Sequence, residues 1–313
     1  MDRYRKLGFR FEPAICYSGY REGQSPDTGV YPSYDEIKED LDILEGRWKY
    51  LRLYDCSRHA EVVLSVIEKE GMDFQVMLGA YIAAEVSNPN CPWGAMYPNG
   101  VLRNNQKKNE AEIEKLIELA NQYPDIIFSL SVGNEATVDW TDHLVPVRRV
   151  MEYARAVKRG ANQPVTFCEN YVPWHHKLAP LVDELDFISI HTYPVWEYKN
   201  IHEALEYTKQ NFFEVADKYP DVPVLITEAG WTTNSNGRGI HPENVNESFQ
   251  EAYYHELIDW SEKEGIITFV FEAFDEPWKG SPDAMEPEKH WGLFKVDRSP
   301  KKVMQKYYPE MAS

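Results

Sequence analysis

Two glutamates end apolar runs in distant parts of the sequence: Glu135 follows 128–134 (FSLSVGN), and Glu228 follows 224–227 (VLIT). A carboxylate at the edge of a protein core is costly unless it is paired, hydrogen-bonded or functional. Taken singly, each glutamate could be a salt-bridged acid at a strand end. Taken together, two such carboxyl groups facing one cleft are the arrangement that cleaves glycosidic bonds.

The elements that would position these glutamates repeat along the whole chain. Apolar runs of strand length alternate with segments of helical periodicity, and most of the runs are continuous, as in parallel strands covered on both faces. This alternation predicts a (β/α)₈ TIM barrel forming a single domain over residues 1–313, with a doubly wound open sheet as the alternative. The runs lie near 13–18, 50–55, 74–82, 126–134, 164–169, 186–193, 223–229 and 267–275.

The helical segments carry apolar stripes. In 34–46, Ile37, Leu41 and Leu44 fall on one face, and Ser33 with Glu36 has the pattern of a capping box. The other predicted helices cover 109–121, 142–160, 200–218 and 243–264. Three irregular segments, 84–104, 232–242 and 276–292, follow the carboxyl ends of strands, where a barrel of this type builds its active site.

The neighbours of the two glutamates suggest different roles for them, because the acid needs a raised pKa and the nucleophile a low one. Asn134 precedes Glu135 and could hold a sugar hydroxyl. Tyr193, which ends the sixth strand, is placed to hydrogen-bond a carboxylate on the adjacent seventh strand. We therefore assign Glu228 as the nucleophile and Glu135 as the acid/base. A separation of about 5–5.5 Å between them would predict retention of configuration.

Longer motifs carry a family resemblance. SVGNE (131–135), ITEAGW (226–231) and FVFEAFDEPWK (269–279) followed by EKHWGLF (288–294) resemble glycoside hydrolase family seventeen, the β-1,3-glucanases and β-1,3-glucan transglycosylases. The match runs from AICYS at 14–18 to the GLF…SP ending at 292–300. It implies cleavage of internal bonds in laminarin-like β-1,3-glucan by double displacement, with no metal or organic cofactor.

The resemblance also implies roles for single residues. Glu135 matches the acid/base and Glu228 the nucleophile, while Glu276, Lys279 and Glu288 match a charged cluster that contacts sugar hydroxyls beside the nucleophile. The chain departs from the plant members of this family in two places. Asp275 stands where they carry asparagine, and the residues around the nucleophile, EAGWT at 228–232, also differ from theirs. It also lacks their long insertion near strand six, which leaves the acceptor side of the cleft undefined.

Aromatic residues at strand ends are further candidates for sugar contact, and each could instead be a packing residue. Tyr54 would point outward from the second strand, while Arg52 beside it would form a buried ion pair. Trp231 follows the nucleophile, and Phe274 and Trp278 follow the eighth strand. The tryptophans that follow strands four, five and six are Trp140, Trp174 and Trp196.

Composition excludes several classes of protein. The net charge of -18 disfavours nucleic acid as a partner. None of the 4 cysteines forms a CxxC pair, and His175, His176 and His191 lack ligand spacing, so we expect no metal site; His191 reads as a hydrogen-bonded strand residue. The absence of a G-x-S-x-G elbow and of a P-loop disfavours serine hydrolases and nucleotide enzymes.

The expected partner is therefore a polysaccharide or oligosaccharide, bound by a monomer. No apolar segment is long enough for a membrane span, and the first residues lack a signal-peptide core. Because the substrate is a polymer, we expect a secreted or periplasmic protein whose leader is not in this sequence. Three alternatives stay open: a transglycosylase with the same catalytic pair, a non-catalytic carbohydrate-binding barrel, and an enzyme acting on a β-1,4-linked glycan.

Overall fold

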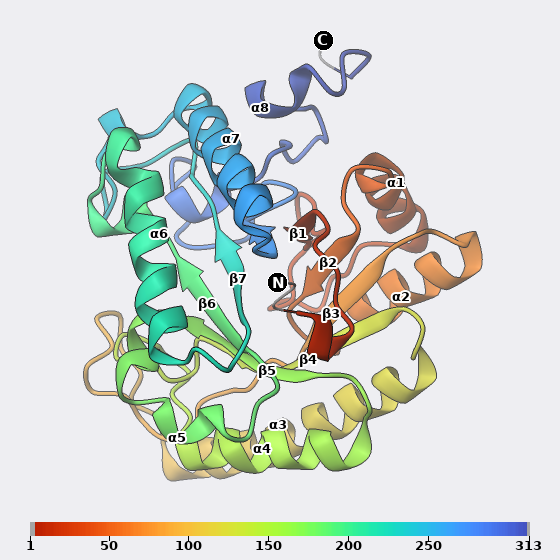
Figure 1. Cartoon of the computed structure of the whole chain (residues 1–313), viewed down its shortest axis with the longest axis vertical. Helices are drawn as coiled ribbons and strands as arrows, with labels where there is room; N and C mark the ends of the chain where they lie inside the picture. Colours follow the sequence, from red (N-terminus) through yellow and green to blue (C-terminus); the bar gives the residue numbers. More distant parts are fainter. Residues whose placement is uncertain (1–3, 312–313) are drawn as a thin grey trace.

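The computed structural model describes residues 4–311, and these form a closed parallel barrel with the strands in sequence order (Figure 1). β1 pairs with β8 as well as with β2, which closes the barrel. The predicted (β/α)₈ architecture is confirmed. The strands are β1 (Ala14–Cys16), β2 (Tyr50–Leu53), β3 (Gln75–Gly79), β4 (Ile127–Asn134), β5 (Val165–Asn170), β6 (Ile188–Thr192), β7 (Val224–Ala229) and β8 (Thr268–Val270).

The strand pairing is irregular where the candidate residues lie. The register shifts between Ser131 and Asn134 in the β4–β5 pair and between Ile190 and His191 in the β6–β7 pair. After the second shift, His191 pairs with Glu228 of β7. Such irregularities re-aim side chains and are frequent next to active sites.

The helices form a ring around the barrel (Figure 1). Ile37, Leu41 and Leu44 of the first helix are fully buried, as their spacing predicts, and Ser33 and Glu36 form the predicted capping box. Within the described part of the chain the helices are α1 (Tyr34–Leu44), α2 (Arg58–Glu70), α3 (Asn99–Gln122), α4 (Val147–Gly160), α5 (Ala179–Val182), α6 (Ile201–Lys218), α7 (Glu247–Glu264) and α8 (Lys302–Gln305). Short 3₁₀ helices cover Arg5–Leu7, Val172–His175, Pro194–Glu197, Pro242–Asn244 and Pro287–Lys289.

Helix boundaries differ from the sequence prediction in three places. α3 begins at Asn99, well before the predicted 109, while α4 and α7 begin later than predicted, at Val147 and Glu247. The first turns of α3 (99–108, NGVLRNNQKK) have no apolar stripe, so periodicity does not reveal them.

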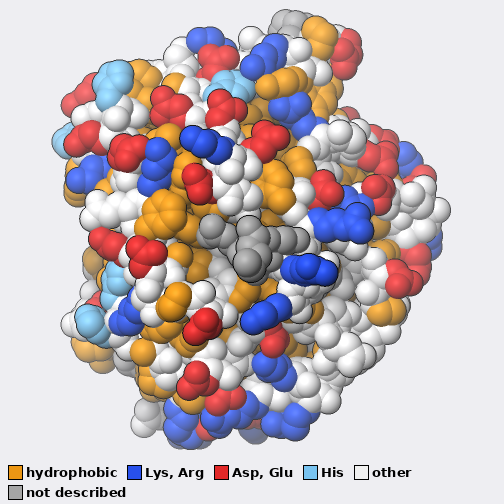
Figure 2. Space-filling view, viewed as in Figure 1, with side chains coloured by type: hydrophobic (Ala, Val, Ile, Leu, Met, Phe, Trp, Pro, Cys, Tyr) orange, Lys and Arg blue, Asp and Glu red, His pale blue; other side chains and the backbone are white. Residues whose placement is uncertain are grey.

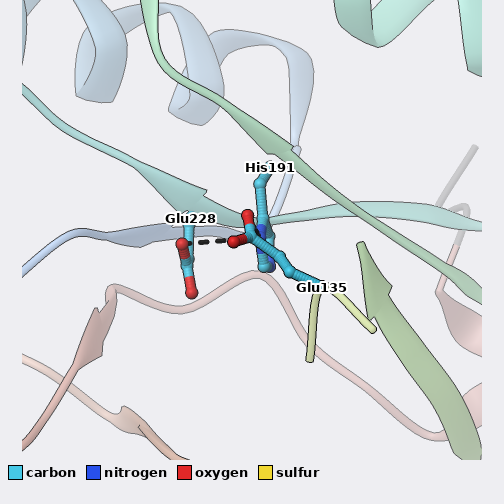
Figure 3. A group of neighbouring side chains, drawn as sticks. All are labelled: Glu135, His191 and Glu228. Atoms are coloured by element: carbon cyan, nitrogen blue, oxygen red, sulfur yellow. Dashed lines mark hydrogen bonds and ion pairs between the residues drawn. The ribbon is translucent and has the colours of Figure 1, made fainter. Parts of the chain in front are cut away.

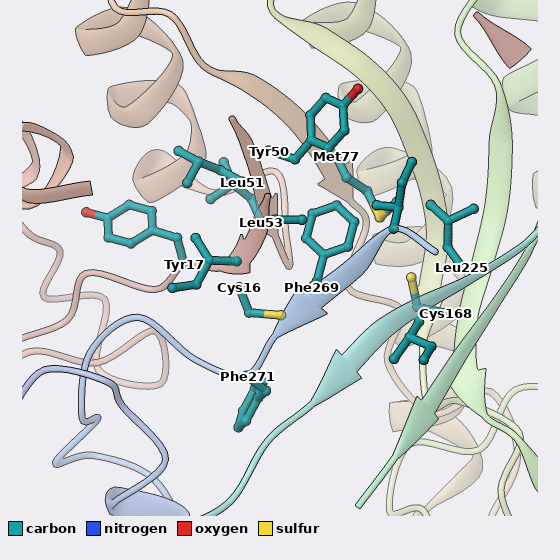
Figure 4. Packing of buried hydrophobic residues seen from close by; sticks show 14 of the residues in the cluster. Cys16, Tyr17, Tyr50, Leu51, Leu53, Met77, Cys168, Leu225, Phe269 and Phe271 are labelled. Atoms are coloured by element: carbon teal, nitrogen blue, oxygen red, sulfur yellow. The ribbon is translucent and has the colours of Figure 1, made fainter. Parts of the chain in front are cut away.

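The core is continuous from the barrel to the helices. Figure 4 shows Cys16, Leu53, Met77, Cys168 and Phe269 packed close together, and all of them are buried. All 4 cysteines of the chain are free and buried, where a thiol packs as a small hydrophobic side chain.

Acidic and basic side chains are interspersed on the face drawn in Figure 2, with apolar side chains between them. None of the helices within residues 4–311 has the length and apolar character that crossing a membrane requires.

Candidate active site

Glu135 stands in a strained turn directly after β4. Its φ is 45°, in the left-handed region that a residue other than glycine enters at a cost of about 1–3 kcal/mol. The turn is fastened to the neighbouring strand, because the Glu135 amide donates to the Cys168 carbonyl at 2.9 Å. The side chain is 31% exposed, so it faces the mouth of the barrel and can reach a bound molecule.

Glu228, in β7, is held by three donors from other strands or strand ends. Arg52 Nη1 lies 2.5 Å from its Oε1, the Tyr54 hydroxyl donates to the same oxygen at 3.1 Å, and the Tyr193 hydroxyl donates to Oε2. The expected contact between Tyr193 and Glu228 is therefore present. The predicted buried ion pair of Arg52 is also present, and its partner is Glu228.

These contacts keep Glu228 ionised. Its side chain is only 6% exposed, and burial by itself would raise the pKa of the carboxyl. His191, Arg52 and the bond from Tyr193 outweigh burial and lower the pKa of Glu228 below its ordinary value. A buried ion pair of this kind can be purely structural, so the neighbourhood of Glu135 is what makes Glu228 a candidate for chemistry.

His191 lies between the two glutamates, and Figure 3 shows its side chain converging with those of Glu228 in β7 and of Glu135 in the turn after β4. Its Nδ1 is 2.8 Å from Glu135 Oε1 and 3.4 Å from Glu228 Oε2. One nitrogen of His191 and one oxygen of each glutamate all lie within 4.8 Å of one another.

Nearest oxygens within 4.8 Å bring the two carboxyl groups close enough for the spacing of a retaining glycosidase, about 5–5.5 Å. Inverting enzymes space the two groups about 6.5–9.5 Å apart to fit a water molecule. A firmly ionised carboxylate beside a partly exposed carboxyl group can supply a nucleophile and a proton donor.

The same three residues are also the group, within residues 4–311, whose donor atoms are close enough to hold a metal ion. A cation there would compete with the Arg52 guanidinium at Glu228 Oε1 and with the His191 proton at Glu135 Oε1. The arrangement therefore fits an ionic hydrogen-bond network better than a metal site.

Two residues predicted to contact the sugar, Asn134 and Tyr54, hydrogen-bond to the Arg52–Glu228 pair. Asn134 Oδ1 accepts a hydrogen bond from Arg52 Nη2 at 2.5 Å, and its backbone carbonyl pairs with His143 Nε2 at 2.9 Å. Tyr54, expected to point outward to a glucose hydroxyl, bonds to Glu228 because the carboxylate lies within reach of its hydroxyl. Both side chains are half-buried and border the mouth.

The charged cluster named from the resemblance lies around Lys279. Its Nζ pairs with Glu276 and, at 3.3 Å, with Glu272 Oε2, while Trp278 Nε1 donates to Glu276 Oε1 at 3.0 Å. Glu276 is fully buried, so direct contact with a sugar, as expected for it, is blocked by this packing; Lys279 and Trp278 are half-buried and reach the surface.

Glu288 completes this cluster. Burial raises the pKa of its carboxyl to about 7; Lys279 opposes this rise, while the negative charges of Glu135 and Glu228 add to it. Glu288 is half-buried. Its response to both glutamates indicates that it lies on the same side of the barrel mouth.

The structure corrects three aromatic candidates. Trp231 is buried against Tyr253 of α7 and donates Nε1–H to the Asn244 carbonyl, so it packs between barrel and helix. Phe274 is buried against Phe294, with the Arg298 guanidinium 4.4 Å from its ring centroid. Trp174 is buried and donates to the Ser189 carbonyl. All three follow strand ends, but their side chains point away from the mouth.

His191 is the hydrogen-bonded strand residue that the sequence predicts, but its position between the two glutamates was not predicted. Glu169 and Glu272 were not singled out. Glu169 ends the predicted fifth strand, which is the same signal that indicates Glu135 and Glu228, whereas Glu272 lies inside the predicted eighth run. The rule for strand ends would therefore have found Glu169 but not Glu272.

Comparisons with curated proteins find glucan-directed relatives. The chain is 22% identical to the "Glucan 1,3-beta-glucosidase" of Arthroderma benhamiae, in an alignment that covers 94% of each. It is 25% identical to the "Probable glucan endo-1,3-beta-glucosidase btgC" of Aspergillus clavatus over 84% of this chain but 38% of that protein. The chain thus spans well under half of the length of the btgC relative and nearly the full length of the Arthroderma benhamiae relative.

Solved structures share the fold. An endo-laminarinase from Formosa Hel1_33_131 superimposes with a TM-score of 0.81 at 26% identity, covering 97% of this chain and 88% of that one. A β-1,3-glucanosyltransferase from Rhizomucor miehei gives a TM-score of 0.71 at 22% identity, covering 95% and 97%, and shows the fold alone.

A family model described as the BtgE/BtgC glycoside hydrolase domain matches residues 14–292. This range contains every barrel strand and both candidate glutamates. The chain therefore belongs to the BtgE/BtgC glycoside hydrolase domain family.

Proposed function

We propose that this chain is a retaining endo-β-1,3-glucanase of glycoside hydrolase family seventeen that cleaves laminarin-like glucan, with Glu228 as nucleophile and Glu135 as acid/base. The observation that carries the proposal is the pair itself: oxygens of a buried, ionised glutamate and of a partly exposed one lie within 4.8 Å. The glucan-directed names of the relatives and of the endo-laminarinase support the choice of substrate.

In the first step, Glu135 donates its proton to the glycosidic oxygen while a Glu228 oxygen attacks the anomeric carbon. The carbon–oxygen bond to the leaving sugar breaks as the covalent glycosyl-enzyme bond forms. Arg52, Tyr54 and Tyr193 favour the ionised form of Glu228 and fix its orientation, so little reorganisation is needed at the moment of attack.

In the second step, Glu135, now a carboxylate, takes a proton from water as the water oxygen attacks the same carbon. The bond to Glu228 breaks, and the product keeps the configuration of the substrate. If a sugar hydroxyl replaces water as acceptor, the same residues perform transglycosylation.

Side chains around the pair would hold the sugar. Lys279, Trp278 and Glu288 border the mouth on the β8 side, and Asn134 borders it beside Glu135. Tyr54 and Tyr193 hold the nucleophile and lie where hydroxyls of the sugar bound to it would arrive.

The test is the release of reducing ends from laminarin by the chain and by Glu135→Gln and Glu228→Gln, with Glu118→Gln on the exposed face of α3 as the matched control. We expect each site variant to lose activity by at least about a hundredfold and the control to keep it. Substantial activity in Glu228→Gln would overturn the nucleophile assignment.

The products and the substrate range separate the alternatives. Hydrolysis of a laminari-oligosaccharide gives only shorter products, whereas transglycosylation also gives longer ones. A parent protein that cleaves β-1,4-linked glycans but no β-1,3-glucan would contradict the proposed specificity. No cleavage of any β-glucan would favour the non-catalytic barrel.

A further inference from the structure

We propose that His191 is a positioning residue that bridges the catalytic pair: as an imidazolium, it donates from Nδ1 toward an oxygen of each glutamate and fixes their spacing. The inference rests on the proposed roles of Glu135 and Glu228. It concerns a residue that does not touch the sugar.

The first argument is geometric. His191 is fully buried, and the register shift immediately before it sets it opposite Glu228. Its Nδ1 faces an oxygen of each glutamate, at 2.8 Å and 3.4 Å. Because the ionised Glu228 only accepts hydrogen bonds, Nδ1 must carry a proton, and that proton faces an oxygen of each glutamate.

The second argument is the charge around the imidazole. The groups that face it from neighbouring strands are Arg52 of β2, Glu135 after β4, Cys168 of β5 and Glu228 of β7, with Tyr193 next to its own strand. The two carboxylates outweigh the single guanidinium, so the site favours a second proton on the ring.

The pKa values agree with this balance. Burial would lower the pKa of His191, but Glu228 and the bonds to Cys168 and Glu135 raise it to about 10 despite Arg52. Burial likewise would raise the pKa of the Cys168 thiol, yet Arg52 and His191 lower it to about 7. The imidazole is thus charged over the range in which most enzymes work.

A charged donor on Glu135 has a defined effect on catalysis. It occupies Oε1, which leaves Oε2 as the oxygen that protonates the substrate. The bridge therefore orients Glu135 toward the glycosidic oxygen and holds it at a fixed distance from Glu228.

The experiment compares kcat and KM on a laminari-oligosaccharide for the chain, His191→Asn and His191→Leu. Asn keeps a neutral donor near the Nδ1 position, whereas Leu keeps neither donor nor charge. Because a misplaced catalytic group slows the chemical step more than it weakens substrate binding, we expect kcat to fall by about tenfold or more in His191→Leu with little change in KM. We also expect partial recovery of kcat in His191→Asn.

A half-buried histidine on α7 provides the control, because His255→Asn should leave kcat and KM unchanged. An unchanged kcat in both His191 variants would overturn the inference. If Glu135→Gln and Glu228→Gln abolish activity while both His191 variants keep the kcat of the parent, the inference fails and the proposed function stands. If those two variants remain active, the proposed function fails.

A second measurement does not depend on activity or on a folded His191 variant. ¹⁵N spectra of histidine-labelled chain report the protonation of His191 directly. We expect it to stay protonated through neutral pH in the parent and to titrate lower in Glu228→Gln, which lacks one of the two charges. A neutral ring in the parent below pH 7 would overturn the inference.

Discussion

Glu169 is a third carboxyl group beside the acid/base. It lies in β5, is fully buried, and accepts hydrogen bonds from the Thr137 amide at 2.9 Å and the Thr137 hydroxyl at 2.7 Å. Thr137 is two residues beyond Glu135, so Glu169 fastens the strained turn from which the acid/base projects. Burial and the charge of Glu135 raise the pKa of Glu169 to about 7, although these hydrogen bonds oppose the rise.

This shift predicts a pH-dependent stability. The folded chain holds the Glu169 proton up to about pH 7, whereas the unfolded chain releases it near pH 4.3. Between these values the folded state binds more protons, so its stability falls as pH rises, by roughly 3 kcal/mol in total. Glu169→Gln stays neutral throughout and loses this contribution.

We therefore expect the melting temperature of the chain to fall relative to that of Glu169→Gln as pH rises from about 4.5 to 7.5. Calorimetry or circular dichroism at matched ionic strength measures the two melting temperatures at each pH. Glu118→Gln, on the exposed face of α3, serves as the control and should show no such trend. Parallel melting curves for the chain and Glu169→Gln would contradict the prediction.

At the scale of single residues, the sequence predicted which side chains stand at strand ends but not which way they point. The convergence of Glu135 and Glu228 followed from the parallel order of β4 and β7. The directions of Trp231 and Phe274 did not, because the chain turns immediately after each strand and the local backbone decides which face they take. Pairing partners, such as Arg52 with Glu228, depend on strands distant in sequence.

At the scale of elements, the loops after β3 and β4 form one unit. Asn88 Nδ2 donates to the carbonyls of Asp139 and Thr141, at 2.9 Å and 2.7 Å, on either side of Trp140. The Tyr97 hydroxyl donates to the Asp142 carbonyl at 2.8 Å. These bonds hold Trp140, which is 38% exposed, on a fixed loop at the acid/base side of the mouth.

Trp140→Ala should weaken binding of long glucan chains. A fixed, exposed indole offers a flat apolar face to a sugar ring, and its loss should cost about 1 kcal/mol, or roughly a fivefold rise in KM. We expect this rise for long laminari-oligosaccharides and little change for the shortest cleaved substrate. Steady-state kinetics with laminari-oligosaccharides of increasing length measures the change in KM.

Phe11 provides the matched control, since it is 36% exposed and precedes β1, at the opposite end of the barrel. Phe11→Ala should leave KM unchanged at every chain length. An equal rise for short and long substrates in Trp140→Ala would instead indicate a disturbance of the catalytic pair.

The sequence predicted strands and helices better where burial imposes a regular pattern of apolar residues. All eight strands lie where continuous apolar runs predict them, because both faces of a barrel strand are covered. The first turns of α3 were not predicted because the apolar residues of 99–108, Val101 and Leu102, form no stripe along the helix. The rest of the helix stabilises these turns. The hydrogen bonds that join the loops after β3 and β4 were not predicted either. Their acceptors are backbone carbonyls, which every residue carries, so the sequence does not indicate them.

At the scale of the whole molecule, the segment after residue 292, beyond the family match, ties the end of the chain to its beginning. Arg298 is buried, and its guanidinium binds both oxygens of Asp40 in α1, at 2.6 Å and 2.7 Å. Lys301 Nζ donates to Asp275 Oδ1 at 2.7 Å. These buried pairs join the first helix, the end of β8 and the C-terminal segment.

Arg298→Ala should destabilise the entire barrel. It leaves Asp40, whose pKa burial raises, with only Arg21 and Tyr17 as partners, and a broken buried pair costs about 3–5 kcal/mol. We expect thermal unfolding to shift down by about 5–15 °C. Lys302→Ala, which breaks the exposed pair with Glu251 in the same segment, should shift it by about 2 °C or less. Equal shifts would mean that the C-terminal segment packs on the barrel without stabilising it through Asp40.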